Sequence, residues 1–295
     1  MIALAGQIGA ILLPVFLIAL AGFVWARADP NFKSQFIGDV SLHIGVPALL
    51  FATLLRAPVD TALLGTAALG AGAYILITHL GLLACLKMSG QALQPGLTGL
   101  SFSNWGNIGM PVCLFAFGQT GLTIAATFFA VSIFLQFTVG WRIASGTWDP
   151  GRLLRFPLLW ALLLAALLRA GNVMPPPWVM DSADLAGGVA IPAMLLALGG
   201  GIARMQPQGL WQALAWAGVR YGLGLVAGLI LITILPIPTE IKPIILLVSM
   251  MPIAVFNYIL AGKTGHDDAA VAGYIVASLV LAMGILPITL ALTLR

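Results

Sequence analysis

Long apolar runs separated by short polar or Pro/Gly-rich stretches dominate this chain. About 20 apolar residues are needed for one helical crossing of a bilayer. Strands of a membrane barrel would instead alternate over segments of about ten residues. The continuous runs therefore predict an all-α membrane protein with about ten transmembrane helices. Their expected spans are 8–26, 35–55, 61–86, 96–117, 121–145, 153–170, 182–203, 208–235, 239–262 and 267–294.

The composition supports lipid as the solvent. Residues of the apolar set AVILMFWYC make up 61% of the 295 positions, and charged residues only 7%. Soluble domains are nearer half apolar and about a quarter charged. The 13 Lys and Arg residues are scattered rather than clustered, so no nucleic-acid partner is expected. We expect a multi-pass protein of the cytoplasmic (inner) membrane.

The distribution of Lys and Arg predicts the orientation. Loops on the cytoplasmic side of a membrane carry an excess of both residues. With both termini outside, the inner connections contain the larger share of them. The expected inner residues are Arg27, Lys33, Lys87, Arg142, Arg152, Arg155, Arg204 and Lys263, and the expected outer ones are Arg56, Arg169, Lys242 and Arg295.

The two halves of the chain resemble each other in three stretches that occur in the same order. Because each half would hold five helices, an odd number, the second copy would enter the membrane upside down. Inverted repeats are common in secondary transporters. We predict a first five-helix repeat at 1–147 and a second, inverted one at 148–295. The matching stretches are VPALLFATL (46–54) with IPAMLLALG (191–199), GAGAYILI (70–77) with WAGVRYGLG (216–224), and MPVCLFAFGQTG (110–121) with MPIAVFNYILAGKTG (251–265).

Two predicted helices are interrupted in mid-membrane, at SFSNWGNIGMP (101–111) in the fourth and SMMPIAVFN (249–257) in the ninth. Proline removes a backbone donor, and the second half of a broken helix begins with free N–H groups at a positive dipole end. Paired interruptions point to a transporter binding site, here for a carboxylate. The alternative is a pair of proline kinks filled by helix packing. The candidate substrate-binding residues are Asn104, Gly106, Asn107, Pro111, Pro252 and Asn257.

The same motifs carry a family resemblance. The stretches SNWGNIGMP (103–111), GQTG (118–121) and MPIAVFNYILAGKTGHDDAAVAGYIVASLV (251–280) resemble the auxin efflux carrier family of membrane transporters, which is related to the bile acid transporters. LLPVFLIALAGFVWAR (12–27) and HIGVPALLFATL (43–54) are similar as well. The resemblance covers nearly the whole chain and suggests a bacterial member.

This resemblance implies two inverted five-helix repeats whose helices four and nine cross at their prolines. It also implies a scaffold of helices one, two, six and seven, a moving transport unit of the others, and a homodimer. Family members carry auxin in plants, and bacterial relatives are associated with malonate, malate and similar carboxylates. The long soluble loop of some plant members between helices five and six is absent here, so auxin is not singled out.

Four further polar residues fall inside predicted membrane helices. Arg220 lies near the middle of the eighth, where an arginine costs about 3 kcal/mol on insertion scales. It either grips the anionic substrate or bonds backbone carbonyls of a broken helix. Asp39 and His43 share one helix face. With His79 they are proton-coupling candidates, or else an interfacial Asp and a hydrogen-bonded His.

We therefore predict a secondary active transporter that moves a small organic anion, a mono- or dicarboxylate, by alternating access. No G-x-x-x-x-G-K-[ST] loop is present, so the energy would come from a gradient. No cofactor and no metal site are expected, and no catalytic motif indicates an enzyme. The alternatives are a sodium-coupled symporter of the bile acid type, which would use oxygens such as those of Ser101 and Ser103, and an ion channel.

Overall fold

The computed structural model describes residues 2–149, 151, 154–265 and 267–294. Its described elements are helices, joined by turns and a few extended residues. Several follow one another without a break, through short π-helical turns labelled η. The bounds are α1 Ile2–Ala28, α2 Ser34–Val40, η1 Ser41–Gly45, α3 Val46–Leu55, α4 Thr61–Met88, α5 Leu93–Leu100, η2 Trp105–Gly109, α6 Met110–Leu135, η3 Gln136–Gly140, α7 Trp141–Ser145, α9 Pro157–Ala170, α10 Pro177–Gly188, α11 Ala190–Arg204, α12 Leu210–Ile234, α13 Lys242–Ser249, α14 Phe256–Thr264 and α15 Asp268–Thr293.

Seven helical stretches of the described chain are long and apolar enough to cross a membrane. An all-α, multi-pass membrane protein is therefore the class that the structure supports. The stretches are Ala3–Ala28, Ser34–Leu55, Thr61–Met88, Trp105–Ser145, Pro177–Arg204, Leu210–Ile234 and Asp268–Thr293.

The stretch Trp105–Ser145 is too long for a single crossing, and Gly118 divides it. Gly118 has φ 62° and ψ −149°, a conformation that is nearly exclusive to glycine. The chain turns back there so closely that a Cβ at Gly121 would lie 2.2 Å from the carbonyl oxygen of Cys113. Residues eight apart in an unbroken helix would be about 12 Å apart along its axis. The reversal falls at the predicted gap between the fourth and fifth segments.

A Gly118→Ala variant is expected to lose about 1–3 kcal/mol of stability, the cost of forcing an alanine into this backbone conformation. No atom lies within 4 Å of the added Cβ, so the loss is conformational rather than steric. Thermal unfolding in detergent measures it. Gly72→Ala in α4 is the matched control, because its added Cβ also meets open space but in a helical backbone. Equal melting temperatures for the two variants would contradict the prediction.

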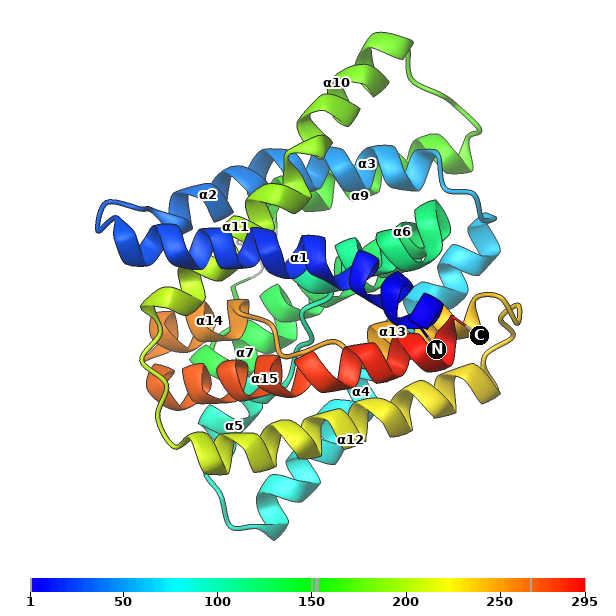
Figure 1. Ribbon diagram of the computed structural model, residues 1–295. Coiled ribbons are helices and arrows are strands. Elements are labelled where there is room, and N and C mark those ends of the chain that lie inside the picture. The colour runs from blue at the N-terminus through cyan, green and yellow to red at the C-terminus, as the bar shows by residue number, and fades with distance from the viewer. Residues whose placement is uncertain (1, 150, 152–153, 266, 295) are drawn as a thin grey trace.

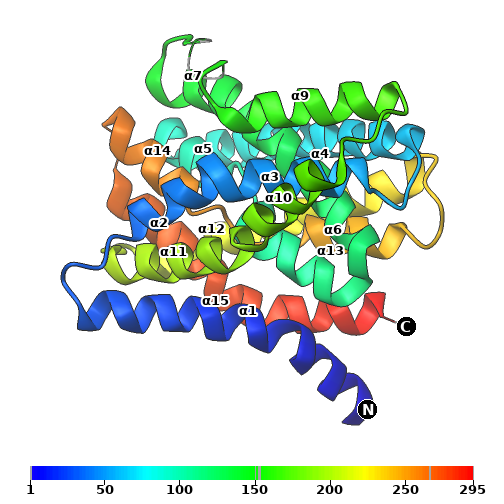
Figure 2. The ribbon, with the colours of Figure 1, turned by 90° about the horizontal axis from the view of Figure 1, so that it is seen from above.

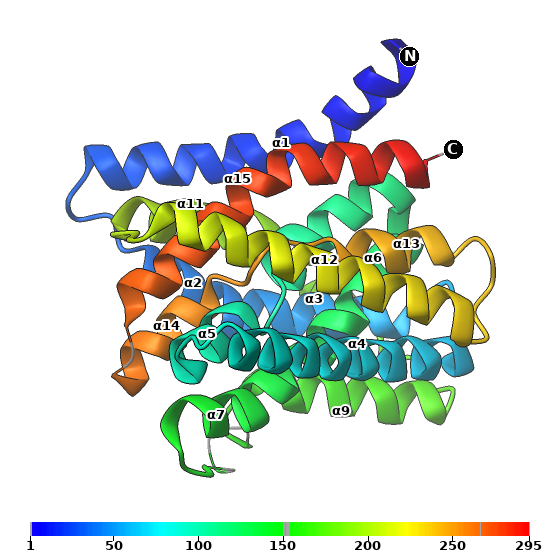
Figure 3. The ribbon, with the colours of Figure 1, turned by 90° about the horizontal axis from the view of Figure 1, so that it is seen from below.

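The helices pack in two groups (Figure 1). In the first, α1 and α2 pack on α11, and α3 packs on α9 and α10. In the second, α12 packs on α4, α13 and α15, and α5 and α14 pack on α15. The helices α1 and α15 extend along nearly the same line but in opposite chain directions, so that α1 begins at the end of the bundle where α15 finishes (Figures 2 and 3). Contacts of α6 with α1 and α3 join the two groups.

Candidate binding site

The two interrupted segments meet and pair with each other in the middle of the bundle. The N–H of Asn104 donates to the carbonyl of Pro252 at 2.7 Å, and the N–H of Ala254 donates to the carbonyl of Phe102 at 2.9 Å. The pairing is antiparallel and centred on Ser103 and Ile253. Each extended segment thereby satisfies backbone groups of the other, as non-helical backbone at membrane depth requires.

This pairing corrects the predicted register of the two interruptions. The expected crossing at both prolines is wrong for Pro111, which lies buried in the first turn of α6 and not in the extended segment. Because η2 runs directly into α6, Pro111 lies inside one continuous helix, just after a π-helical turn in which the usual i→i−4 bonds are replaced. Pro252 does lie at the crossing. Phe102 and Pro252 have equivalent places in the two hydrogen bonds, as acceptors, and two residues further on Asn104 and Ala254 are equivalent as donors.

The carboxyl end of α5 is capped by two buried side chains of the second group. The Arg220 Nε–H donates to the carbonyl of Leu100 at 2.9 Å. The Asn257 amide donates to the carbonyl of Gly99 at 2.9 Å. Both donors satisfy carbonyls that have no partner at the last turn of a helix.

The carboxyl end of α13 is capped in the same way from the other half of the chain. The Tyr74 hydroxyl donates to the carbonyl of Ser249 at 2.7 Å. The Trp105 indole N–H donates to the carbonyl of Val248 at 2.8 Å. Both negative helix ends at the crossing are therefore occupied, whereas the amino ends of η2 and α14 face a cavity.

A cavity of about 370 Å³ lies against these amino ends. At the crossing, one interrupted segment lines the cavity with Ser103, Asn104, Gly106 and Asn107. The other segment lines it with Ala254, Val255 and Phe256. Other lining residues come from α2, α6, α11 and α14, including Asp39, Phe129, Met194, Arg204 and Lys263. The cavity thus lies between the two helix groups.

Asn104 combines two roles at this wall. Its Oδ1 accepts the N–H of Asn107 at 3.1 Å and so caps the helix that begins at Trp105. Its Nδ2 is buried and has no hydrogen-bond partner among the described residues. The residue is only 4% exposed. An unpaired buried donor beside a helix amino end is an arrangement that accepts an anionic oxygen.

Comparison with known proteins identifies the family. The model of the family described as membrane transport protein matches residues 144–290, about half of the chain. The chain belongs to this family, the auxin efflux carriers. It is a family of membrane transporters and not of enzymes. The curated proteins searched contain no match to the chain.

In this transporter, two of the predicted substrate-binding side chains make hydrogen bonds within the crossing and do not line the cavity. Asn257 is 0% exposed; its amide also lies 3.4 Å from the carbonyl of Phe102, and its Oδ1 accepts from Gln136 at 2.9 Å. Arg220 is 4% exposed. Neither residue lines the cavity, and nor does Pro111 or Pro252. For Arg220 the geometry matches the alternative of an arginine bonded to a broken helix.

Gly106 is required by its neighbour in the cavity wall of the transporter. A Cβ at this position would lie 2.6 Å from the ring of Phe129. Because both residues line the cavity, glycine here lets the aromatic ring approach the first turn of the helix. Asn107, a predicted substrate-binding residue, also lines the cavity.

The expected carboxylate–imidazole pair of Asp39 and His43 is not formed. His43 Nδ1 bonds the backbone carbonyl of Asp39 at 2.8 Å, because a spacing of four residues in a helix brings a side chain close to that carbonyl. His43 is exposed and its ring packs on the edge of Phe156. His79 lies elsewhere, at the crossing, with its ring 5.2 Å from that of Phe102. The three candidates do not form one cluster, although Asp39 lines the cavity.

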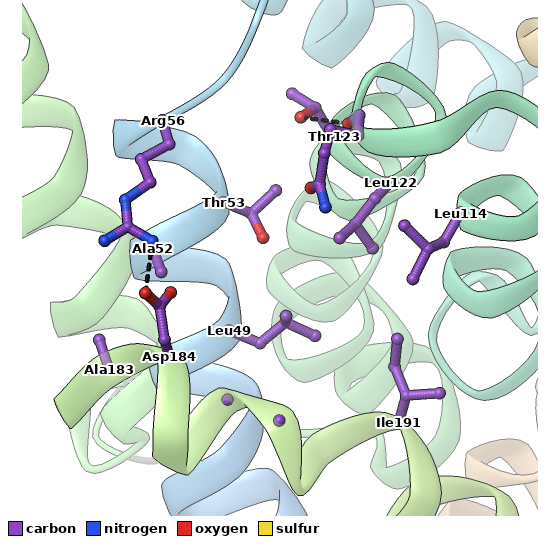
Figure 4. Close-up of a pocket in the computed structure, with 13 residues that line it drawn as sticks. Leu49, Ala52, Thr53, Arg56, Leu114, Leu122, Thr123, Ala183, Asp184 and Ile191 are labelled. Atoms are coloured by element: carbon purple, nitrogen blue, oxygen red, sulfur yellow. Dashed lines mark hydrogen bonds and ion pairs between the residues drawn. The ribbon is translucent and has the colours of Figure 1, made fainter. Parts of the chain in front are cut away.

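A second cavity of the transporter, of about 430 Å³, lies at the opposite end of α2–α3 (Figure 4). Asp39 in the first cavity and Arg56 in the second are separated by seventeen positions of nearly continuous helix, roughly 25 Å. Arg56 pairs with Asp184 at its wall. The lining residues are Leu49, Ala52, Thr53, Arg56, Leu114, Gln119, Leu122, Thr123, Ala183, Asp184, Gly187, Gly188 and Ile191.

Among the residues that the structure describes, no group of three or more His, Cys, Asp or Glu side chains is placed to hold a metal ion.

Proposed function

We propose that the protein is a secondary active carrier that moves a small organic anion, a mono- or dicarboxylate, across the cytoplasmic membrane. The observation that carries this proposal is the unpaired Asn104 Nδ2, buried in the wall of the cavity at a helix amino end. Removing such a donor from water without a partner costs free energy. A carboxylate oxygen in the cavity would supply the missing acceptor.

The electrostatics of the crossing favour an anion over a cation. Helix amino ends carry a partial positive charge and helix carboxyl ends a partial negative one. Both carboxyl ends at the crossing already have side-chain donors, including the Arg220 guanidinium. The amino ends at Trp105 and Phe256 are those left beside the cavity. With about 370 Å³, the cavity has room for a carboxylate of a few carbons.

Two cavities at opposite ends of one helix group support alternating access. Both are lined on one side by α2, α3, α10 or α11 and on the other by α6, which packs on α4 and α13 of the second group. Movement of the second group along the first would carry the crossing from one cavity toward the other. The first group then acts as the scaffold and the second as the transport unit.

We further propose ten crossings in two inverted repeats, 1–147 and 148–295, with both termini outside. The pairs α5 with η2–α6 and α13 with α14 would each form one interrupted crossing, and α9 would complete the set. In the register of the backbone pairing, Asn107 corresponds to Asn257. The beginning of α1 and the finish of α15 at one end of the bundle (Figure 2) suit an even number of crossings.

Sodium coupling is the second candidate, and the crossing argues against it. Of the oxygens expected to serve it, Ser101 Oγ is bonded to the carbonyl of Leu97, and Ser103 Oγ accepts from Arg220 at 2.6 Å. A sodium ion at Ser103 would have to lie beside a guanidinium. The geometry therefore favours an anion without sodium.

The test is uptake of labelled malonate, malate, pyruvate and indole acetate into proteoliposomes, with a proton gradient, a sodium gradient or neither. The decisive variant is Asn104→Asp. Aspartate remains a good helix cap, but it replaces the free donor by a negative charge. Saturable uptake of one acid is expected in the wild type. In the variant it should fall at least about tenfold, consistent with a charge-assisted hydrogen bond of about 1.5–3 kcal/mol.

Asn31→Asp is the matched control, since it makes the same change in an exposed loop and should transport normally. If no acid is taken up, or if Asn104→Asp transports as well as Asn31→Asp, the anion site at the crossing is disproved.

A further inference from the structure

Ser103 is held between the buried guanidinium of Arg220 and the cavity. Arg220 Nη2 lies 2.6 Å from Ser103 Oγ, and Ser103 is itself part of the cavity wall. The same guanidinium bonds the carbonyl of Leu100 and the hydroxyl of Tyr74, at 2.9 and 3.0 Å. These contacts from three elements hold the guanidinium in place.

The direction of the bond between Arg220 and Ser103 is determined by chemistry. A guanidinium has only donors, whereas a serine hydroxyl has one donor and two acceptor lone pairs. Ser103 Oγ must therefore accept from Arg220, which leaves its own proton available. Within the described chain this proton has no acceptor, because the bond from Arg220 is the one hydrogen bond that the hydroxyl makes.

We propose that the Ser103 hydroxyl donates a hydrogen bond to the anionic oxygen of the substrate, and that Arg220 is the positioning residue behind it. This inference rests on the proposed carrier function and adds a binding residue to its site. Arg220 contributes without touching the substrate. It orients the hydroxyl, and its charge polarises the O–H bond, since hydrogen bonds in a chain strengthen one another.

The arrangement predicts selectivity for charge. A permanent cation lies one side chain behind the wall, and it is not ion-paired to a carboxylate in the described part of the structure. An anionic oxygen on Ser103 would be attracted by this cation, whereas a neutral amide would gain far less. Ser103 and Arg220 would thus discriminate a carboxylic acid from its own amide, which has nearly the same shape.

The experiment compares Ser103→Ala with Ser101→Ala in the proteoliposome assay, using the transported acid and its primary amide as a competitor. Ser101 is the matched control, because its hydroxyl bonds the carbonyl of Leu97 and it does not line the cavity. In Ser103→Ala we expect the KM for the acid to rise about tenfold, equivalent to one hydrogen bond to a charged group. The maximal rate and the inhibition constant of the amide should stay near their wild-type values, and Ser103→Thr should restore the KM.

Arg220→Gln tests the positioning role. It should raise the KM for the acid in the wild-type background and change it much less in Ser103→Ala, since the two residues act as one unit. Size-exclusion chromatography reports whether this variant folds; if it does not, the comparison of Ser103→Ala with Ser103→Thr still decides.

A Ser103→Ala variant with the KM of Ser101→Ala would overturn this inference while leaving the carrier function intact. An equal loss of affinity for acid and amide would overturn it too, because that result indicates a change of shape. Absence of any acid uptake by the wild type would instead disprove the proposed function.

Discussion

In a Gly199→Ala variant, helices α1 and α11 are expected to separate. The expected loss of stability is about 3 kcal/mol or more, which is at or above the upper end of the usual cost of overpacking. A Cβ at Gly199 would lie 1.8 Å from the carbonyl oxygen of Ala19. The contact is reciprocal, since a Cβ at Gly22 would lie 2.2 Å from the carbonyl oxygen of Leu196. Both obstacles are backbone atoms, which cannot turn aside as a side chain could.

The melting temperature in detergent and the yield of monodisperse protein measure this effect. Gly218→Ala in α12 is the control, because no atom lies within 4 Å of the added Cβ and the backbone is helical. Small residues commonly allow such close approach of membrane helices. If Gly199→Ala and Gly218→Ala have the same melting temperature, α1 and α11 are not in the close contact described here.

The second large effect is expected for Asn257→Asp. This change keeps the shape of the side chain but removes the N–H groups that face the carbonyls of Gly99 and Phe102. A carboxylate oxygen would take their place against two carbonyl oxygens at a position that is 0% exposed. We expect a loss of about 3 kcal/mol or more, since an unsatisfied buried group costs about 1–3 kcal/mol and a charge costs more.

The readouts are the melting temperature and, where protein is recovered, uptake of the transported acid. Asn31→Asp, the same change in an exposed loop, should match the wild type in both. A stable Asn257→Asp variant that only raises the KM would restore Asn257 as a substrate ligand, the role expected from the sequence. A stable variant with normal transport would show that the crossing does not depend on this side chain.

The sequence predicted the two interruptions well, because their cause is local. Runs of polar and small residues such as SFSNWGNIG stand out in an apolar chain, and the chain is indeed extended around Ser103 and Ile253, before η2 and α14 begin. The reversal at Gly118 falls in the gap that the sequence left between the fourth and fifth expected spans. The amino-acid sequence did not reveal which residues of the two interrupted segments pair with each other. Pro111 and Pro252 align by residue type, but the backbone hydrogen bonds place Asn104 opposite Pro252 and Phe102 opposite Ala254.

Composition and apolar periodicity thus determined the solvent, the helical class and the places where the helices break, because each depends on a residue and its near neighbours in lipid. The tertiary structure alone decided what the polar side chains at the crossing do. Arg220 and Asn257 point to carbonyls more than a hundred residues away in the chain, whereas Ser103 and Asn104 line the cavity, and the Asn104 Nδ2 has no partner among the described residues. Which buried donor finds a partner depends on distances between segments that are remote in sequence, and only the folded chain sets those distances.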